Sequence, residues 1–179
     1  IIGLAAVAIM VIACGSNSSK RDKRNVISQS DKVEQREERN SNSVTLPNFT
    51  QNDISGQPVN LHKAISDNKV TLIDFWASWC GICLAAMPEV KKLAEEYKGK
   101  FSVIGVSIDT KQEAWTKAME KHPEPWPQYI TTAQGYQDLF HKYQVGNGVP
   151  YYLMITPDGK VLGSPSGPEE VREILQKYE

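Results

Sequence analysis

Two cysteines, Cys80 and Cys83, are the residues of this sequence best suited to carry out chemistry. Such a pair can close a small disulfide, or it can reduce a disulfide of another protein through thiolate attack. The pair follows an apolar run, residues 70–76, and precedes a helical pattern that starts at Gly81. We expect Cys80 at the helix N-terminus, where free N–H groups and the helix dipole favour the thiolate. We therefore predict that Cys80 is exposed and attacks, and that Cys83, one turn further on the same side, resolves the mixed disulfide.

Asp74 is the lone acid within that apolar run. A buried carboxylate is costly unless it is paired or protonated, so its pKa is expected to rise. Asp74 has the same strand parity as Cys80 and is expected near the base of the helix. One interpretation is that it accepts and donates a proton for Cys83. The alternative is a structural acid that is hydrogen-bonded at a strand edge, and the neighbouring cysteine pair favours the first.

Other uses of a cysteine pair fit this sequence less well. Structural zinc needs about four ligands, yet no second cysteine pair exists and the three histidines show no ligand spacing. Haem attachment needs a histidine directly after the second cysteine, and Leu84 stands there. A disulfide that closes so small a loop adds little stability. A net charge of −1 and the lack of a basic, aromatic-rich cluster argue against nucleic acid as a partner. We expect no metal and no cofactor beyond the cysteine pair itself.

The elements that position these residues alternate between strand and helix patterns. A hairpin is expected around the turn Ser55–Gly56. Further strands are predicted at 70–76, 101–108, 128–131, 151–155 and 161–162, and helices at 81–98, at 109–121 with Asp109 as N-cap, at 135–143, and from Pro168 onward. The order predicts an α/β fold with a central mixed sheet flanked by helices.

The spacing of apolar residues predicts which helix faces are buried. The four helices are expected to bury, in chain order, Ala86, Val90, Leu93, Ala94 and Tyr97; Trp115, Ala118 and Met119; Leu139, Phe140 and Tyr143; and Val171, Ile174, Leu175 and Tyr178.

The first residues of the chain predict export. Residues 1–13 are almost wholly apolar, too short for the roughly 20 residues that span a bilayer but typical of a signal peptide. Small residues flank Cys14, as in a bacterial lipobox, so residues 1–14 are predicted to be a signal whose true start is missing, with lipid on Cys14. A plain secretory signal with an incidental cysteine is the alternative. Residues 15–43 are polar and charged and predict a disordered tether, and residues 44–179 are predicted to fold.

The block from Asp74 to Cys83 resembles the active-site block of the thioredoxin superfamily, specifically of its membrane-anchored TlpA/ResA-like branch. Pro88 is similar to the helix-kinking proline of that family, and Val149-Pro150 to its cis-proline site. The resemblance covers residues 44–179 and implies a thioredoxin-like fold with an N-terminal hairpin and an inserted helical segment between Asp109 and Tyr143. It also implies a substrate-binding surface, formed by Trp79, Gly81, Ile82, Val149 and Pro150.

Three positions depart from the family pattern. Ile82 replaces the usual proline between the cysteines, and residues there tune the redox potential. Ala86 stands where many anchored relatives carry an acid, so Asp74 would have to transfer the proton alone. Tyr151 follows Pro150 where threonine is common. It either narrows the substrate groove or simply packs in the strand.

These patterns predict a monomeric, lipid-anchored thiol-disulfide oxidoreductase in the cell envelope of a bacterium, facing the periplasm or the exterior. The resemblance implies that it reduces exported proteins such as apocytochromes c and is recharged by a membrane thiol reductant. One alternative is a peroxiredoxin-like thiol peroxidase with an antioxidant role. Those enzymes typically need Thr or Ser three residues before the reactive cysteine, and Ala77 stands there. Another is a non-catalytic binding lipoprotein on the same fold.

Overall fold

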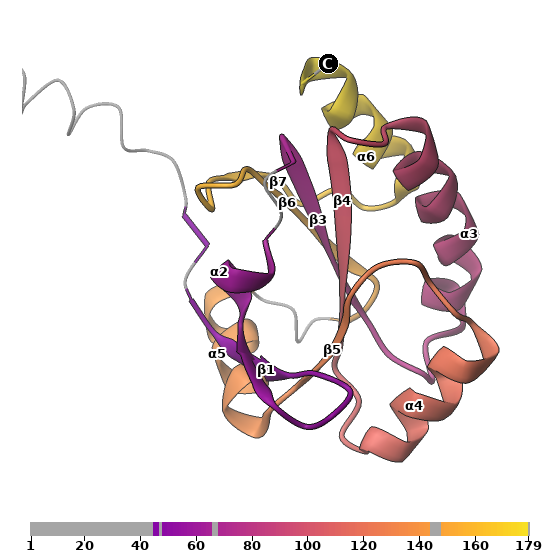
Figure 1. The fold of residues 1–179 in the computed structure, drawn as a ribbon, viewed down its shortest axis with the longest axis vertical. Helices are drawn as coiled ribbons and strands as arrows, with labels where there is room; N and C mark the ends of the chain where they lie inside the picture. The colour runs from indigo at the N-terminus through magenta and orange to yellow at the C-terminus, as the bar shows by residue number, and fades with distance from the viewer. Residues whose placement is uncertain (1–44, 47, 66–67, 144–147, 179) are drawn as a thin grey trace, which may run out of the picture. The chain divides into compact units, whose positions relative to one another are not determined.

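A computed structural model describes residues 45–46, 48–65, 68–143 and 148–178 of the chain. Over these residues the strands form one sheet of seven, in the order β2-β1-β5-β4-β3-β6-β7 (Figure 1). The strands are β1 (Thr50–Asn52), β2 (Pro58–Asn60), β3 (Val70–Trp76), β4 (Phe101–Ser107), β5 (Gln128–Thr131), β6 (Tyr151–Ile155) and β7 (Val161–Gly163). The helices are α2 (Leu61–Ala64), α3 (Gly81–Glu96), α4 (Gln112–Lys121), α5 (Ala133–Tyr143) and α6 (Pro168–Leu175), followed by the 3-10 turn η2 (Gln176–Tyr178).

The sheet is mixed, as predicted. Strand β3 runs parallel to β4 and antiparallel to β6, and β4 runs parallel to β5. The hairpins β1–β2 and β6–β7 are antiparallel, and β1 also pairs with β5. All seven residues of β3 are buried, because neighbouring strands flank it and helices cover both faces of the sheet. This explains why its sequence is continuously apolar apart from Thr71 and Asp74.

The two faces of the sheet are covered by different helices (Figure 1). On one face, Ile73 and Phe75 of β3 pack in a cluster with Leu61 of α2 and Leu139 of α5. The opposite face is covered by α3, α4 and α6, whose side chains pack on it in two clusters. One cluster contains Leu72 of β3, Val90 and Leu93 of α3, and Val171 and Leu175 of α6. The other contains Trp76 of β3, Cys83 and Met87 of α3, and Trp115 of α4. The alternation of side chains along β3 thus places residues 72, 74 and 76 beneath α3.

Several predicted burial assignments are wrong. Met87, rather than Ala86, is buried in the first turns of α3. Phe140 is 44% exposed, since it lies one position around the helix from the inward-facing Leu139. Tyr178 is 38% exposed, because α6 ends at Leu175 and the 3-10 turn that follows changes the direction of the side chains. The side chain of Tyr143 lies outside what the structure describes.

The predicted helix boundary at Asp109 is also wrong. Helix α4 begins at Gln112 with Lys111 as its N-cap residue, and no side chain caps it. Asp109 cannot serve as the cap because its carboxylate is engaged elsewhere, beside the active-site loop. The short helix α2 was not predicted at all.

Candidate active site

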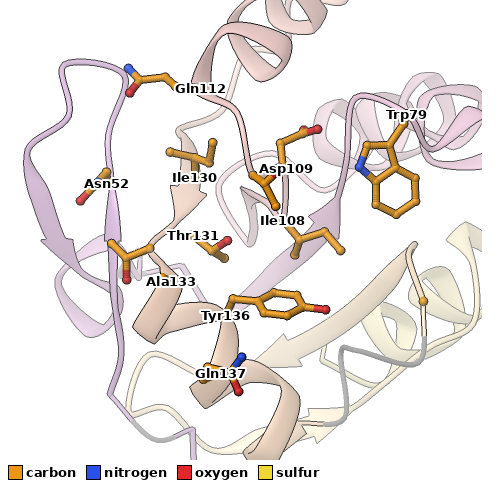
Figure 2. A pocket seen from close by; sticks show the side chains of 13 residues that line it. Asn52, Trp79, Ile108, Asp109, Gln112, Ile130, Thr131, Ala133, Tyr136 and Gln137 are labelled. Carbon is orange, nitrogen blue, oxygen red and sulfur yellow. The ribbon is translucent and has the colours of Figure 1, made fainter.

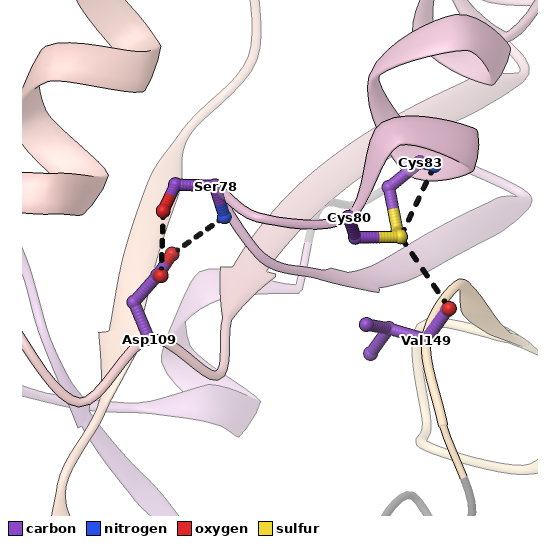
Figure 3. The surroundings of a disulfide bond; sticks show 5 residues. All are labelled: Ser78, Cys80, Cys83, Asp109 and Val149. Carbon is purple, nitrogen blue, oxygen red and sulfur yellow. Dashed lines mark hydrogen bonds between the residues drawn. A yellow bond between two sulfur atoms is a disulfide. The ribbon is translucent and has the colours of Figure 1, made fainter.

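Cys80 and Cys83 are joined by a disulfide at the start of α3, with their Cα atoms 5.3 Å apart. Cys80 is the N-cap residue of the helix, and the N–H of Cys83 donates to Cys80 Sγ over 3.2 Å (Figure 3). The N–H of Cys80 itself donates to the carbonyl of Ala77. The predicted position of Cys80 at a helix N-terminus is therefore confirmed. A Cys80 thiolate at this position would receive both the Cys83 N–H and the favourable end of the helix dipole.

The prediction that Cys80 is exposed is wrong for the disulfide form. Cys80 is only 4% exposed and Cys83 only 2%, because the pair packs in a cluster that includes Trp76, Ala77 and Met87. The side chains that protrude beside the pair are those of Trp79 and Ile82, at 67% and 72% exposure. A partner that approaches the disulfide would therefore meet these two apolar side chains first.

Val149-Pro150 lies against the disulfide, as the resemblance implied. The peptide bond between the two residues is cis, and the carbonyl oxygen of Val149 lies 3.4 Å from Cys80 Sγ (Figure 3). A disulfide sulfur has no hydrogen to donate, so this is a contact in the oxidised form. In the dithiol form the Cys80 thiol can donate to the same oxygen.

Tyr151, the next residue, packs in the fold. Its ring centroid is 5.8 Å from that of Phe75, and its hydroxyl lies 3.1 Å from Ser164 Oγ. Of the two interpretations of Tyr151, these contacts support strand packing.

Asp74 is buried beneath α3, with 2% of its surface exposed. It stands directly opposite Gly105 of β4 and Tyr152 of β6, and its Oδ1 atom has no hydrogen-bond partner among the described residues. Burial raises the pKa of Asp74 to about 7, and the charge of Glu124 adds to the shift. The predicted rise in pKa is confirmed. The unpartnered oxygen also disfavours the alternative of a hydrogen-bonded structural acid.

Glu124 is a second acid near Asp74 that sequence reasoning missed. Its side chain is 8% exposed, and its Oε2 atom lies 3.8 Å from Nζ of Lys91 on α3. Burial raises the pKa of Glu124, while the charges of Lys91 and His122 act in the opposite direction. The sequence predicted a helix that ends at residue 121 and a strand that begins at residue 128. No local pattern indicates that the loop between them turns an acid inward.

Asp109 ties the loop before the cysteines to the end of β4. Its carboxylate accepts hydrogen bonds from the Ser78 N–H over 2.8 Å, from Ser78 Oγ over 2.7 Å and from Ser107 Oγ over 2.7 Å. Figure 3 shows the two bonds to Ser78 just ahead of Cys80. The network holds the segment that delivers Cys80 to the helix start, so Asp109 is a positioning residue rather than a helix cap.

Two hollows lie beside this loop and differ in charge. A groove of about 620 Å³ runs from Trp79 past Ile108 to Tyr136 of α5 and also reaches Gly148 (Figure 2). Among the described residues that line this groove, Asp109 is the one charged side chain. A smaller hollow of about 320 Å³, bordered by Ser78 and Leu84, is lined by Lys117, Lys121 and His122. The groove beside Trp79 is thus nearly uncharged, whereas the hollow beside Leu84 is basic.

The described residues contain neither a metal-binding cluster nor a membrane-spanning helix. Within them, no three His, Cys, Asp or Glu side chains are grouped so as to hold a metal ion. Helices long and apolar enough to cross a membrane are likewise absent from this part of the chain. Cys14 lies outside the described residues.

The family model for Redoxin matches residues 41–177. This chain belongs to the Redoxin family. Its fold, cysteine pair and cis-proline agree with that family's thioredoxin-like architecture, and the predicted membership of the thioredoxin superfamily is confirmed.

Three relatives illustrate the likeness. The chain is 29% identical to the thiol-disulfide oxidoreductase ResA of Bacillus thuringiensis over 133 residues, which cover 74% of this chain and 73% of that protein. It is 50% identical to thioredoxin 1 of Chlorobaculum tepidum over 42 residues, covering 24% of this chain and only 42% of the thioredoxin. The thioredoxin domain of a thiol-disulfide oxidoreductase from Bacteroides vulgatus superposes with a TM-score of 0.67 at 26% identity, covering 76% of this chain and 96% of that one. Thiol-disulfide oxidoreduction is the activity named for the Bacillus and Bacteroides proteins.

Proposed function

We propose that this chain exchanges disulfides with other proteins through Cys80 and Cys83. The observation that carries the proposal is the disulfide at the N-terminus of α3, with the Cys83 N–H directed at Cys80 Sγ and the Val149 carbonyl beside it. Once the disulfide is reduced, the same N–H group would stabilise a thiolate on Cys80 Sγ. The activities named for the relatives support the same conclusion.

In the reducing direction, the Cys80 thiolate attacks one sulfur of a substrate disulfide. The substrate S–S bond breaks, its second sulfur leaves as a thiolate that takes up a proton, and a mixed disulfide forms. Cys83 then loses its proton and attacks Cys80 Sγ, which releases the first substrate sulfur as a thiol. Two electrons pass to the substrate, and the protein is left with the Cys80–Cys83 disulfide.

Asp74 is the group we propose to accept the proton of Cys83. It lies on the face of β3 beneath α3, as do Leu72 and Trp76, whose clusters contain residues of that helix. A pKa of about 7 suits a group that must both take and return a proton near neutral pH. No further cofactor is needed in this scheme, because the cysteine pair holds both electrons.

Substrates are proposed to bind across Trp79, Gly81, Ile82, Val149 and Pro150. Trp79 and Ile82 offer exposed apolar surface, and the Val149-Pro150 segment offers backbone groups to an extended polypeptide. The nearly uncharged groove described above shares Trp79 with this surface.

The cellular setting is proposed from the sequence. Residues 1–14 would direct export, Cys14 would carry lipid, and residues 15–43 would tether the domain of residues 44–179 to the membrane of a bacterial cell envelope. There the protein, as a monomer, would reduce exported proteins such as apocytochromes c, and a membrane thiol reductant would recharge it. Mass spectrometry of the protein made in a bacterial host tests the anchor, because a diacylglycerol on Cys14 adds a defined mass that a Cys14→Ser variant lacks.

Insulin reduction with dithiothreitol tests the activity. Cys80→Ser is expected to abolish it, while Cys14→Ser, which also removes one cysteine but leaves the pair intact, should keep full activity. Full activity of Cys80→Ser would overturn the mechanism. Cys83→Ala should accumulate mixed disulfides on Cys80, and the captured proteins would identify the substrates.

The same preparations test the thiol-peroxidase alternative. Ala77 is buried three residues before Cys80 and offers no hydroxyl to a peroxide. We therefore expect little consumption of hydrogen peroxide, and rapid turnover would favour the peroxidase instead.

A further inference from the structure

The side chain of Gln128 lies across the neighbouring strand at Gly105. Asp74 of β3, Gly105 of β4 and Gln128 of β5 stand in one row across the sheet. A Cβ atom added at Gly105 would overlap Oε1 of Gln128 and would lie 2.5 Å from its Cδ atom. Any residue larger than glycine at position 105 would therefore displace the carboxamide of Gln128.

That carboxamide accepts a hydrogen bond from the indole of Trp76 on β3. The distance from Trp76 Nε1 to Gln128 Oε1 is 3.0 Å. Trp76, Trp115 and Trp126 are all buried. The indole N–H groups of the other two have no hydrogen-bond partner among the described residues, so Trp76 is the one of the three that is held by such a bond. A buried N–H that loses its acceptor costs free energy, so the bond also restricts where the ring can lie.

Trp76 connects this bond to the redox centre. Its side chain packs in the same cluster as Cys80, Cys83 and Met87, and its backbone carbonyl accepts the N–H of Ile108. The backbone of Trp76 is thus held by the sheet and its ring by Gln128, while the ring itself forms part of the apolar packing around the disulfide. A substitution of Gln128 would therefore alter the packing around the cysteines by moving the indole of Trp76.

We propose that Gln128 is a positioning residue of the redox centre, which holds the Trp76 indole against the Cys80–Cys83 pair, and that Gly105 is required to admit it. The inference rests on the redox function proposed above. It concerns how the pair is shielded, which can be measured without a protein substrate.

The test is the rate at which dithiothreitol reduces the native disulfide. Gln128→Met keeps the length of the side chain but removes the acceptor. Because the disulfide is almost wholly buried, a loosened indole should expose it and speed reduction about fivefold, the factor that corresponds to one net hydrogen bond. Gln176→Met, at an exposed glutamine in η2, is the matched control and should reduce at the wild-type rate.

A double-mutant cycle with Trp76→Phe separates positioning from general destabilisation. Phenylalanine has no N–H for Gln128 to accept, so Gln128→Met should not change the reduction rate further in the Trp76→Phe background. An unchanged rate in Gln128→Met alone would overturn the proposal. The same acceleration with and without Trp76 would also overturn it, because Gln128 would then act by another route.

Gly105→Ala provides an independent arm. Its methyl group should expel the carboxamide and speed reduction, and Gln128→Ala, which removes the carboxamide, should speed reduction as well. In Gly105→Ala/Gln128→Ala these two effects should not add. Full additivity would contradict the proposed role of Gly105. If Gly105→Ala does not fold, the cycle with Trp76 decides. Failure of the proposed oxidoreductase function would be seen in a different experiment, as an insulin-reduction rate that is unaltered in Cys80→Ser.

Discussion

Two buried aspartates, Asp74 inside β3 and Asp109 just after the end of β4, differ in their surroundings. They are 2% and 4% exposed. Asp109 accepts three hydrogen bonds from Ser78 and Ser107, whereas Oδ1 of Asp74 has no partner among the described residues. Similar burial therefore accompanies a hydrogen-bonded carboxylate in one case and a carboxyl group of raised pKa in the other.

The difference comes from where each residue stands along its strand. Asp109 follows the end of β4, where the loop around Ser78 offers an N–H and a hydroxyl that no strand uses. Asp74 lies inside β3, whose backbone groups are committed to β4 and β6 on either side. A carboxylate inside a central strand can be hydrogen-bonded only by side chains. Among the described residues none of them donates to Oδ1 of Asp74.

The largest expected effect is on stability in Asp74→Asn. The pKa of Asp74 rises from 3.8 to about 7 on folding. Below about pH 4 the carboxyl is neutral in both states. Between about pH 4 and 7 only the unfolded chain releases the proton, so the free energy of unfolding falls as the pH rises, by about 4 kcal/mol in all.

Asn mimics the neutral carboxyl, so Asp74→Asn should be about 4 kcal/mol more stable than wild type at pH 8 and about equal at pH 4. Urea denaturation of the oxidised protein at the two pH values measures this. Equal stability of the two proteins at pH 8 would contradict the assignment of Asp74 as a desolvated acid.

Asp109→Ala should have the opposite sign. It removes the acceptor of three hydrogen bonds, and we expect it to lower the free energy of unfolding by about 3 kcal/mol at pH 8. Insulin reduction should also slow, because the loop before Cys80 loses its tie to β4. A stable Asp109→Ala with wild-type activity would remove the contrast between the two aspartates.

Glu124→Gln tests whether the negative charge of Glu124 raises the pKa of Asp74. The charge of Glu124 helps to raise the pKa of Asp74 in the folded protein. Its removal should therefore lower the upper end of the pH range over which stability is lost, and should make the total loss smaller. The measurement is the free energy of unfolding at several pH values from 4 to 8. Glu120→Gln, at an exposed glutamate of α4, is the control and should leave the profile in place. Identical profiles for all three proteins would show that Glu124 does not act on Asp74.

The smallest effect is expected from Ser78→Ala. It removes the hydroxyl that bonds to Asp109 Oδ1 but keeps the backbone N–H bond to Oδ2. We expect a loss of about 1 kcal/mol in thermal or urea denaturation, with little change in activity. A loss as large as that of Asp109→Ala would mean that the hydroxyl alone carries the network.

The course of the chain was largely predictable because strand and helix periodicities are local. The strand 70–76 and the start of α3 at Gly81 were predicted from apolar spacing, and the structure has both at those residues. Phe140 was misassigned because adjacent apolar residues on a helix face different ways, and only packing selects one of them. Asp109 was misassigned because its residue type is typical of an N-cap, whereas in the fold its carboxylate accepts hydrogen bonds from Ser78 and Ser107.

The candidate site was predictable where it rests on contiguous residues. Cys80, Cys83 and Asp74 belong to one short block, and Val149-Pro150 was found by resemblance. Glu124, Gln128 and Gly105 were not found, since each acts on a residue that is distant along the chain. Their residue types carry no local signal of that role.

By itself, the sequence determined that a cysteine pair begins a helix after a buried strand, with an acid inside that strand, because helix starts and strand interiors leave patterns in neighbouring residues. Only the tertiary structure decided that the disulfide is buried and that Gln128 reaches Trp76 over a glycine. It also decided that Oδ1 of Asp74 has no hydrogen-bond partner among the described residues, while the Asp109 carboxylate accepts three hydrogen bonds. These outcomes depend on which side chains meet across strands, and strand pairing brings together residues that are far apart in the chain.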